Sequence, residues 1–371
     1  MSDHGNYQDR IDRVRQAMSR KSIDAILITP GSDLLYLTGY NAIPLERITA
    51  LAITQNRDPF LVVPRLERST ALASPFGRTG WEVLAWDEND DPYVLISGRL
   101  GNATSSIAVD SHMWAERVFA LQSRFGSTQF SVASPLISEI RMRKNPAELE
   151  ALREAASAID RVHAAVPSLL RVGRTEREVG RDIGELILTE GHERVDFIIV
   201  ASGPNSASPH HELSDRVIQA GEAVVVDIGG TMPSGYCSDC TRTYFMGEPD
   251  SLYSDRYQVL RQAQELSSKS VRPGARSHDI DAAGRNELAV HGLAEYFIHR
   301  TGHGIGLDTH EEPYIGVDNA TVIEESMVFS VEPGFYVEGV HGARIEDIVV
   351  CTSSGYESLN KQPRDLLIIE G

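Results

Sequence analysis

Short apolar runs and amphipathic segments alternate along the first third of the chain. Ile11, Val14 and Met18 recur at helical spacing, which predicts an amphipathic helix over residues 7–20. Between segments that are turn-rich or compatible with helix, strand-sized apolar runs occur at 24–29, 47–54, 59–64, 81–85 and 105–110. Alternating strands and helices are typical of an α/β domain. We therefore predict an α/β domain over residues 1–135.

A second unit is predicted to begin near Asn145-Pro146, because proline suits the first position of a helix. Its core face would be formed by apolar residues at helical spacing, namely Leu149, Leu152, Ala156, Ile159 and Val162. Thr175 and Glu178 have the spacing of a capping box, which predicts the start of another helix. Two more helices are expected at about 254–271 and 277–292, and we assign residues 145–371 to this second domain.

A short pattern recurs within the second domain. Residues 173–179 and 274–280 both read glycine, four residues, an acidic residue and an aliphatic one. Each copy joins two predicted helices and precedes a predicted strand and a polar cluster. A duplicated unit with a site between its halves would explain the repeat, but a match this short also arises by chance. The sequence leaves both explanations open.

Composition narrows the class of protein. The 371 residues are 41% hydrophobic and 24% charged, which is ordinary for a soluble globular protein with a sizeable core. A net charge of −18 argues against a nucleic-acid partner. No stretch approaches the roughly 20 apolar residues of a membrane helix, and the N-terminus lacks the apolar core of a secretory signal. Three cysteines are too few for a disulfide framework. We predict a cytoplasmic protein without membrane or nucleic-acid partners.

Two aspartates mark a predicted β-hairpin. Asp227 ends a buried-strand run and is followed, after Ile228, by two glycines, and Asp239 lies among strand-forming residues after a Pro-Ser-Gly turn. A hairpin of these strands would present both carboxylates close together. Either aspartate alone would be better explained as a surface residue near a turn.

Three histidines, His299, His303 and His310, fall within twelve residues. The glycines at 302, 304 and 306 disfavour a long helix and allow the backbone to approach a ligand closely. A lone histidine is most often structural or a hydrogen-bonding surface residue. Three in a glycine-rich segment favour a functional site.

Two glutamates lie in or beside apolar strands. Glu332 ends an apolar run before Pro-Gly, and Glu346 lies inside another run, where period-two alternation places it on one face with Arg344. A charge in a core strand is costly unless it is paired or bound to a metal. Surface alternation is an alternative explanation for Glu346.

These candidates form a donor set of four carboxylates and one imidazole, which suits Mn, Co, Fe or Zn better than a thiolate-seeking site. Bridging carboxylates hold two cations about 3.5–4 Å apart in dinuclear aminopeptidases. Cys237 and Cys240 resemble half a zinc knuckle, but the chain has no second cysteine pair. Strand alternation would also place their thiols on opposite faces, so we interpret both cysteines as structural.

The candidate ligands occur in a familiar order. The sequence resembles the pita-bread metallopeptidases, which include methionine aminopeptidase, aminopeptidase P and prolidase. Gly-His-Gly-Ile-Gly-Leu, Val-Glu-Pro-Gly and Arg-Ile-Glu-Asp carry the resemblance over about 145–371, and the N-terminal part resembles a creatinase-like N-domain. The resemblance implies an α/β two-domain protein, with a creatinase-like N-terminal domain at 1–135 and a pita-bread catalytic domain of duplicated α+β structure at 145–371. It also implies a homodimer, because N-domains in this family often close the neighbouring active site.

The resemblance implies two divalent metal ions per subunit, with Mn as the leading expectation and Co, Zn or Fe as alternatives. Asp227 would chelate one metal, while Asp239 and Glu346 would bridge both. His303 and Glu332 would complete the shell of the other metal.

Four further residues match positions around the substrate. His210 lies in the segment 203–211, which resembles the one that supplies a substrate-facing histidine in prolidases. His299 and His310 match two additional histidines of the prolidase and aminopeptidase P branch, and His310 is expected to stabilise the developing oxyanion. Arg344 would orient Asp239 or the substrate.

The implied reaction is hydrolysis of Xaa-Pro dipeptides by a hydroxide activated by two metals, with release of proline. Glu332 would relay a proton towards the leaving nitrogen. The alternatives are an Xaa-Pro aminopeptidase acting on longer peptides, or a non-peptidase pita-bread enzyme such as a lyase or an amidinohydrolase. A non-catalytic binding module is disfavoured by the complete ligand set.

Two departures from the family pattern affect these expectations. Asp227 and Asp239 are twelve residues apart instead of the common eleven, and we expect the turn at 231–235 to absorb the extra residue. Tyr314 stands where some prolidases have an arginine, so the usual anchor for the substrate carboxylate is missing. Arg47 is a candidate to supply that charge to a partner subunit. A salt bridge with Glu46 or simple exposure would explain Arg47 equally well.

Overall fold

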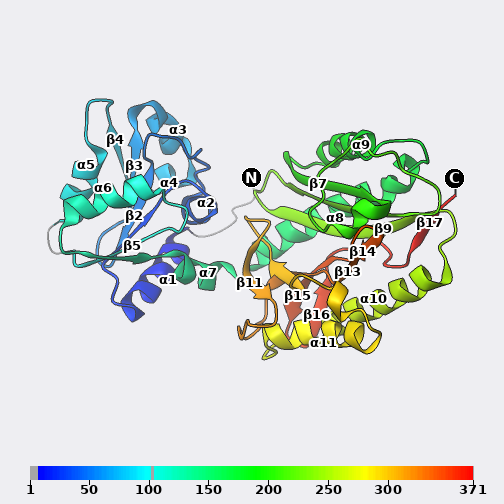
Figure 1. The fold of residues 1–371 in the computed structure, drawn as a ribbon. Helices are drawn as coiled ribbons and strands as arrows, with labels where there is room; N and C mark the ends of the chain where they lie inside the picture. The colour runs from blue at the N-terminus through cyan, green and yellow to red at the C-terminus, as the bar shows by residue number, and fades with distance from the viewer. Residues whose placement is uncertain (1–6, 102–103, 371) are drawn as a thin grey trace. The chain divides into compact units, whose positions relative to one another are not determined.

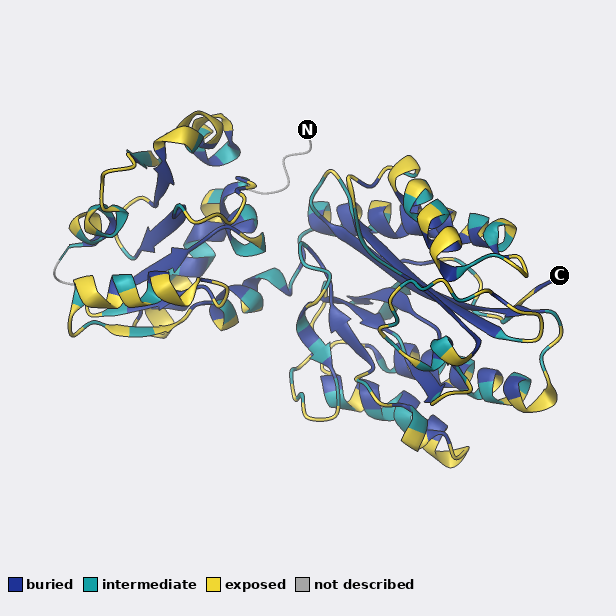
Figure 2. Ribbon diagram, turned by 45° about the horizontal axis from the view of Figure 1, so that its top comes forward, coloured by how far each residue is buried: buried dark blue, intermediate teal, exposed yellow. Residues whose placement is uncertain are grey.

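A computed structural model describes residues 7–101 and 104–370. The chain divides into two compact units between Arg141 and Met142, and each unit has its own sheets and core (Figure 1). In both units the strands are largely buried, while the exposed residues gather on loops and on the outward faces of helices (Figure 2).

The N-terminal unit is built on a six-stranded mixed sheet of order β4-β3-β2-β1-β5-β6. Its strands are β1 (Ala25–Ile28), β2 (Ala50–Thr54), β3 (Phe60–Pro64), β4 (Glu82–Trp86), β5 (Ser106–Val109) and β6 (Gln129–Val132). Its α-helices are α1 (Tyr7–Arg20), α2 (Ser32–Thr38), α3 (Arg68–Ala73), α4 (Pro75–Arg78), α5 (Pro92–Leu100), α6 (Ala115–Phe125) and α7 (Ser134–Arg141).

The predicted first helix and the five predicted strands of this unit are confirmed, and β6 was missed. The residues of β6 are mostly exposed, so its sequence carries no continuous apolar run. Its backbone pairing with β5, from Ser106 opposite Gln129 to Val109 opposite Val132, is what defines the strand. Exposed edge strands of this kind leave little trace in hydrophobic periodicity.

The first half of the second unit contains α8 (Pro146–Leu169), α9 (Glu176–Thr189), β7 (Arg194–Ser202), β8 (Ala223–Thr231) and β9 (Cys237–Met246). Pro146 occupies the first turn of α8, as predicted, and Asn145 forms a capping box with Glu148. The predicted capping box of Thr175 and Glu178 is present at the start of α9. Side chains of α8 and α9 pack against one face of β7, β8 and β9.

The second half contains α10 (Ser251–Ser270), α11 (Ser277–Val290), β10 (Gly302–Gly304), β11 (Glu311–Ile315), β12 (Val328–Val331), β13 (Gly334–Val337), β14 (His341–Arg344), β15 (Asp347–Thr352), β16 (Gly355–Ser358) and β17 (Leu367–Ile369). Both predicted helices are present. Helix α10 begins three residues earlier than predicted, because the Asp250 carboxylate accepts the Tyr253 N–H and caps the helix there.

Three sheets form the interior of this unit. They have the strand orders β17-β9-β8-β7, β11-β10-β12-β15-β16 and β13-β14. The strands lie between α9 on one side and α10 and α11 on the other (Figure 1). The pairing of β8 with β9 confirms the predicted hairpin.

The internal repeat is a structural duplication. The Gly173 N–H donates to the Ile218 carbonyl at 3.0 Å, and the Gly274 N–H donates to the Ile323 carbonyl at 2.9 Å. The return bonds also match, from Ile218 to residue 174 at 2.9 Å and from Ile323 to residue 275 at 2.8 Å. Both glycines have positive φ, 94° and 86°, which favours glycine at the two equivalent turns. Each half of the unit thus starts its second helix from the same turn.

Candidate metal centre and active site

The hairpin of β8 and β9 brings Asp227 and Asp239 together. Asp227 pairs with Thr241 and Asp239 pairs with Gly229, so the two aspartates are diagonal neighbours on one face of the hairpin. The absence of a side chain at Gly229 leaves room for Phe197 on β7, because a Cβ there would lie 2.4 Å from the phenyl ring. A glycine at position 229 is therefore required by close packing in the sheet.

The second half of the unit supplies one histidine and two glutamates. His303 is the central residue of β10, and Glu332 directly follows β12. The Glu332 N–H donates to the Thr301 carbonyl at 2.8 Å, which holds these two segments side by side. Glu346 lies between β14 and β15, and its N–H donates to the Thr241 carbonyl on β9 at 3.1 Å. That last bond ties the two halves together at the site.

The five predicted ligands converge at the junction of the two halves. Potential ligand atoms lie within 4.8 Å of one another in two groups drawn from them, Asp227 with Asp239 and Glu346, and His303 with Glu332 and Glu346. The Nε2 atom of His303 is 3.2 Å from a Glu332 oxygen and 3.6 Å from an Asp239 oxygen. Glu346 belongs to both groups.

The electrostatics of this cluster are unfavourable without cations. Burial is the main cause that raises the pKa of Asp239, with the charge of Glu346 adding to it, and burial likewise raises the pKa of Glu346. Burial raises the pKa of Glu332 to about 7. Four carboxyl groups gathered out of water favour protonation unless positive charge is supplied.

The donor set fits a pair of divalent cations. Among the described residues, Asp227 Oδ1 and Glu346 Oε1 are buried oxygens without a hydrogen-bond partner. Buried polar atoms are normally paired, so unpaired carboxylate oxygens facing one another indicate an intended cationic partner. Carboxylates with one imidazole are hard and borderline donors suited to divalent first-row metals.

Arg344 is engaged with Asp227 and not with Asp239. Its guanidinium donates to an Asp227 oxygen, to the Tyr336 hydroxyl at 2.8 Å and to Thr241 Oγ1 at 3.1 Å. Thr241 Oγ1 in turn donates to Glu346 Oε2 at 2.7 Å. Of the two expected roles, the structure places Arg344 on Asp227 where Asp239 was expected, because the hairpin register sets Asp227 opposite Thr241, the residue that Arg344 also contacts. Its role in orienting the substrate stays a prediction.

His299 is held by the protein at both ring nitrogens. Its Nδ1 lies 2.7 Å from the Arg300 carbonyl, and its Nε2 lies 2.9 Å from the Tyr336 hydroxyl. Burial and the charge of Arg344 lower the pKa of His299 to about 3, so the ring is neutral. The tyrosine hydroxyl can then donate to Nε2 while it accepts from Arg344. His299 thus helps to orient Arg344.

His210 and His310 line a cavity of about 1050 Å³ that opens onto the five converging side chains. The His310 ring is tilted against the His303 ring at a centroid distance of 3.9 Å. Burial lowers the pKa of His310, and the charge of Arg300 adds to this effect. Phe197, Ile198 and Leu213 also line the cavity and contribute apolar surface.

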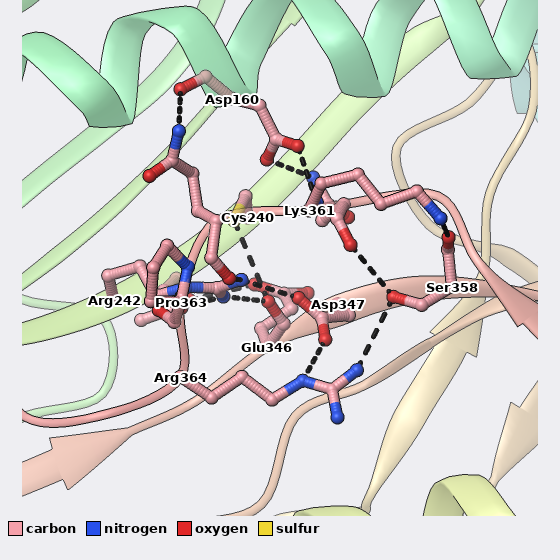
Figure 3. Close-up of polar contacts among 12 residues, drawn as sticks. Asp160, Cys240, Arg242, Glu346, Asp347, Ser358, Lys361, Pro363 and Arg364 are labelled. Atoms are coloured by element: carbon pink, nitrogen blue, oxygen red, sulfur yellow. Dashed lines mark hydrogen bonds and ion pairs between the residues drawn. The ribbon is translucent and has the colours of Figure 1, made fainter.

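A closed polar network lies next to Glu346 (Figure 3). Asp347 is fully buried and accepts from Arg242 at 2.6 Å and from Arg364 at 2.5 Å. Arg242 also donates to the Glu346 carbonyl at 2.6 Å and to the Thr241 carbonyl at 2.9 Å. Arg242 thus binds the backbone of both Glu346 and Thr241.

Arg47 lies in the N-terminal unit, in the segment before β2. Its guanidinium donates to Glu88 at 2.6 Å and also contacts Glu46. The alternative explanation of Arg47, a salt bridge with Glu46, is therefore present within this unit. A role for Arg47 in a partner subunit stays a prediction.

Several residues of the site carry no signal in the sequence. Tyr336 reaches Arg344 because β13 and β14 pair with Phe335 opposite Ala343. Thr241 is one of many threonines in strands and becomes informative only through its register. A polar residue two positions from a candidate ligand on a strand was the one clue available for Thr241, because such a residue shares the ligand's face.

Known proteins can be compared with this geometry. Residues 150–353 match metallopeptidase family M24, and residues 10–143 match the creatinase/prolidase N-terminal domain. A probable dipeptidase PepE of Mycobacterium tuberculosis is 46% identical over 363 residues, which cover 98% of this chain and 96% of the relative. An Xaa-Pro dipeptidase of Lactobacillus helveticus is 33% identical, over 97% of this chain and 98% of its own. The crystal structure of dipeptidase PepE from Mycobacterium ulcerans has a TM-score of 0.95 at 45% identity, covering 100% and 99% of the two chains.

The two-unit fold and the buried carboxylate–histidine cluster thus define a metallopeptidase with a creatinase-like N-terminal domain. The chain belongs to metallopeptidase family M24. The predicted combination of this N-terminal domain with a pita-bread catalytic domain is confirmed. Over the residues that the structure describes, no helix is both long and apolar enough to cross a bilayer.

Proposed function

We propose that the protein hydrolyses Xaa-Pro dipeptides and releases proline, using two divalent metal ions. The observation that carries this proposal is the convergence of five side chains at the base of one cavity, with two of their buried oxygens unpaired. The similarity to an Xaa-Pro dipeptidase along nearly the whole chain supports the choice of substrate.

Asp227, Asp239, His303, Glu332 and Glu346 would hold the metal ions. Glu346 belongs to both groups drawn from the predicted ligands, and Asp239 lies near both Asp227 and His303, so these two carboxylates would be available to either metal ion. Bound divalent metals supply Lewis-acid activation of a water molecule and of the scissile carbonyl group. We propose Mn as the native metal, with Co, Zn and Fe as alternatives.

The cavity offers matching surfaces for an Xaa-Pro substrate. The apolar side chains of Phe197, Ile198 and Leu213 would receive the pyrrolidine ring. His310 and His210 line the same cavity and would donate hydrogen bonds to the carbonyl oxygen of the scissile bond. Such donors are effective because charge develops on that oxygen during attack.

Proton transfer falls to residues at the base of the cavity. Glu332 is buried beside His303 and accepts from Ser330 Oγ at 3.0 Å, which fixes one carboxylate oxygen. Its carboxylate would take the proton of the attacking water and pass it to the leaving proline nitrogen. Arg344 and His299 would hold Asp227 in place during this step.

A metal-reconstitution assay tests the proposal. The protein is stripped with a chelator, loaded with Mn²⁺ and assayed for proline release from Ala-Pro, with Ala-Ala as the matched control. We expect two metal equivalents per chain, hydrolysis of Ala-Pro and no comparable hydrolysis of Ala-Ala. A chain that never binds stoichiometric metal would refute the proposed centre.

An Xaa-Pro aminopeptidase acting on longer peptides is the second candidate. The cavity volume of about 1050 Å³ favours it, because this is at the upper end of typical ligand pockets and exceeds the needs of a dipeptide. Comparing Ala-Pro with Ala-Pro-Pro separates the two candidates. Activity on the tripeptide alone would contradict the dipeptidase assignment.

We also propose a cytoplasmic homodimer in which Arg47 reaches the active site of the partner subunit. The exposure of Ile43 (70%) and Leu45 (44%) close to Arg47 supports an interface in this segment. Sedimentation analysis measures the oligomeric state directly. A monomer with full peptidase activity would contradict both the dimer and the proposed role of Arg47.

A further inference from the structure

Three arginines line the active-site cavity, and they differ in how their charge is used. Arg344 is buried and bonded to Asp227, Tyr336 and Thr241. Arg177 forms an ion pair with Asp215 at 2.7 Å. For Arg300, the described part of the chain provides neither an ion pair nor a side-chain hydrogen bond. Arg300 is therefore the cavity arginine whose charge is available to a ligand.

The Arg300 guanidinium is nevertheless held in a defined place. Its Cζ atom lies 4.1 Å from the centroid of the Tyr314 ring, which is a cation–π contact. The stem of Arg300 packs against Gly316, where an added Cβ would lie 3.2 Å from the Arg300 Cβ. The backbone of Tyr314 is held in turn, because its N–H donates to the Glu312 carboxylate at 3.0 Å. Stacking uses the face of the guanidinium and leaves its N–H donors free at the edges.

The backbone on both sides of Arg300 is fastened to helix α11. Arg285 donates to the His299 carbonyl at 2.8 Å, and Asp281 accepts the Thr301 N–H at 3.1 Å. Arg285 and Asp281 are joined by an ion pair at 2.8 Å. This scaffold contains no predicted metal ligand, and it fixes the point from which the Arg300 side chain extends.

Arg300 contributes to the lining of two cavities. It lines the active-site cavity and also a neighbouring cavity of about 630 Å³, whose other lining residues include Tyr314, Val317 and Asn319. Its charge contributes to the lowered pKa of His310, after the larger effect of burial. The side chain is thus close to the centre but at the boundary of the cavity.

The free carboxylate of an Xaa-Pro dipeptide needs a cation that is not already paired. We propose that Arg300, seated on Tyr314, binds this carboxylate and thereby selects dipeptides, an inference that rests on the proposed function. The planar edge of the guanidinium matches a carboxylate. A longer peptide carries a peptide bond after the proline in place of the carboxylate and would not form this ion pair.

Arg300→Gln tests this assignment with two substrates, Ala-Pro and Ala-Pro amide, which lacks the carboxylate. We expect the ratio of kcat/KM for Ala-Pro over the amide to fall about 30-fold, mainly through KM, because a charge-assisted bond is lost. Hydrolysis of the amide should change less than about two-fold. Arg300→Lys keeps the charge but not the planar fork and should restore part of the ratio.

Arg177→Gln is the matched control, since it removes a cavity-lining arginine whose charge is already paired. It should leave the substrate ratio unchanged. Metal content and thermal unfolding verify that each variant is folded. An unchanged ratio in Arg300→Gln, or equal losses on both substrates, overturns the role of Arg300 alone. Failure of the unmodified enzyme to hydrolyse Ala-Pro overturns the proposed function and the Arg300 assignment with it.

Discussion

Glu346 and Asp347 are neighbours in the chain, and both are buried, yet their surroundings differ. Glu346 lies close to Asp227 and Asp239 and has one oxygen without a hydrogen-bond partner among the described residues. Asp347 is paired with Arg242 and Arg364 (Figure 3). The negative charge of Glu346 is left without a neutralising partner among the described residues, whereas that of Asp347 is neutralised by two arginines.

The contrast separates function from structure. Burial alone does not distinguish the two residues, since their exposed fractions are 2% and 0%. What distinguishes them is whether the protein itself supplies the neutralising charge. A buried acid with internal partners stabilises the fold or its specificity, whereas a group of acids without partners is a site for cations. Glu346 thus belongs to the proposed cation site, and Asp347 belongs to a network that stabilises the fold.

The largest expected effect is on catalysis and concerns Glu346, the carboxylate that lacks a charge partner within the described protein. Glu346→Gln should lower kcat/KM for Ala-Pro about 1,000-fold, because it removes a ligand shared by both groups of predicted metal ligands. Metal content per chain should fall with it, as measured by elemental analysis of Mn-loaded protein. Glu357→Gln is the control, because Glu357 pairs with Arg153 away from the cavity. Full metal content and activity in Glu346→Gln would contradict the assignment.

In the compensated network, Asp347→Asn should lower the stability of the protein. It leaves Arg242 buried without its charge partner, and breaking such a pair costs about 3–5 kcal/mol in the free energy of unfolding. Denaturant unfolding measures this loss. Activity per folded, Mn-loaded molecule should stay within a few-fold of the unmodified enzyme.

Asp365→Asn is the matched control for that prediction. Asp365 pairs with Arg261 at 3.3 Å, but its side chain is 75% exposed. An exposed pair contributes at most about 1 kcal/mol, so little stability should be lost. If Asp347→Asn proved no more destabilising than Asp365→Asn, the distinction between the two acid environments would be wrong.

The smallest expected effect concerns the buried His163 and the dependence of the free energy of unfolding on pH. Burial, with a further contribution from Arg242, lowers the pKa of His163 from 6.5 to about 3. Between these values the unfolded chain binds a proton that the folded chain does not bind. This stabilisation is complete above pH 6.5 and is lost as the pH falls towards 3.

Lowering the pH from 6.5 to 5.5 should therefore reduce the free energy of unfolding by about 1 kcal/mol through His163 alone. His163→Gln should be less sensitive by that amount when both proteins are unfolded in chelator. Parallel pH profiles for the two proteins would show that His163 does not contribute.

Much of the fold could be predicted, because local signals are strong where burial is periodic. Helix α9 is specified by the capping box of Thr175 and Glu178, and the first half of β8 by the apolar run before Asp227, although the strand continues beyond Asp227 to Thr231. The exposed edge strand β6 escaped prediction, because pairing with β5 and not its own pattern defines it. The duplication was visible as a short repeat but became distinguishable from chance only through its matched hydrogen bonds.

The chain by itself determined the chemistry that is available: four carboxylates and an imidazole in recognisable segments, set beside apolar strands. Tertiary structure alone decided which of these charges are compensated. It placed Arg344 on Asp227, gave Asp347 two arginines, and left Arg300 stacked on Tyr314 without an acidic partner among the described residues. The physical reason is that charge compensation depends on distances of a few ångströms between distant segments, and residue order does not contain them.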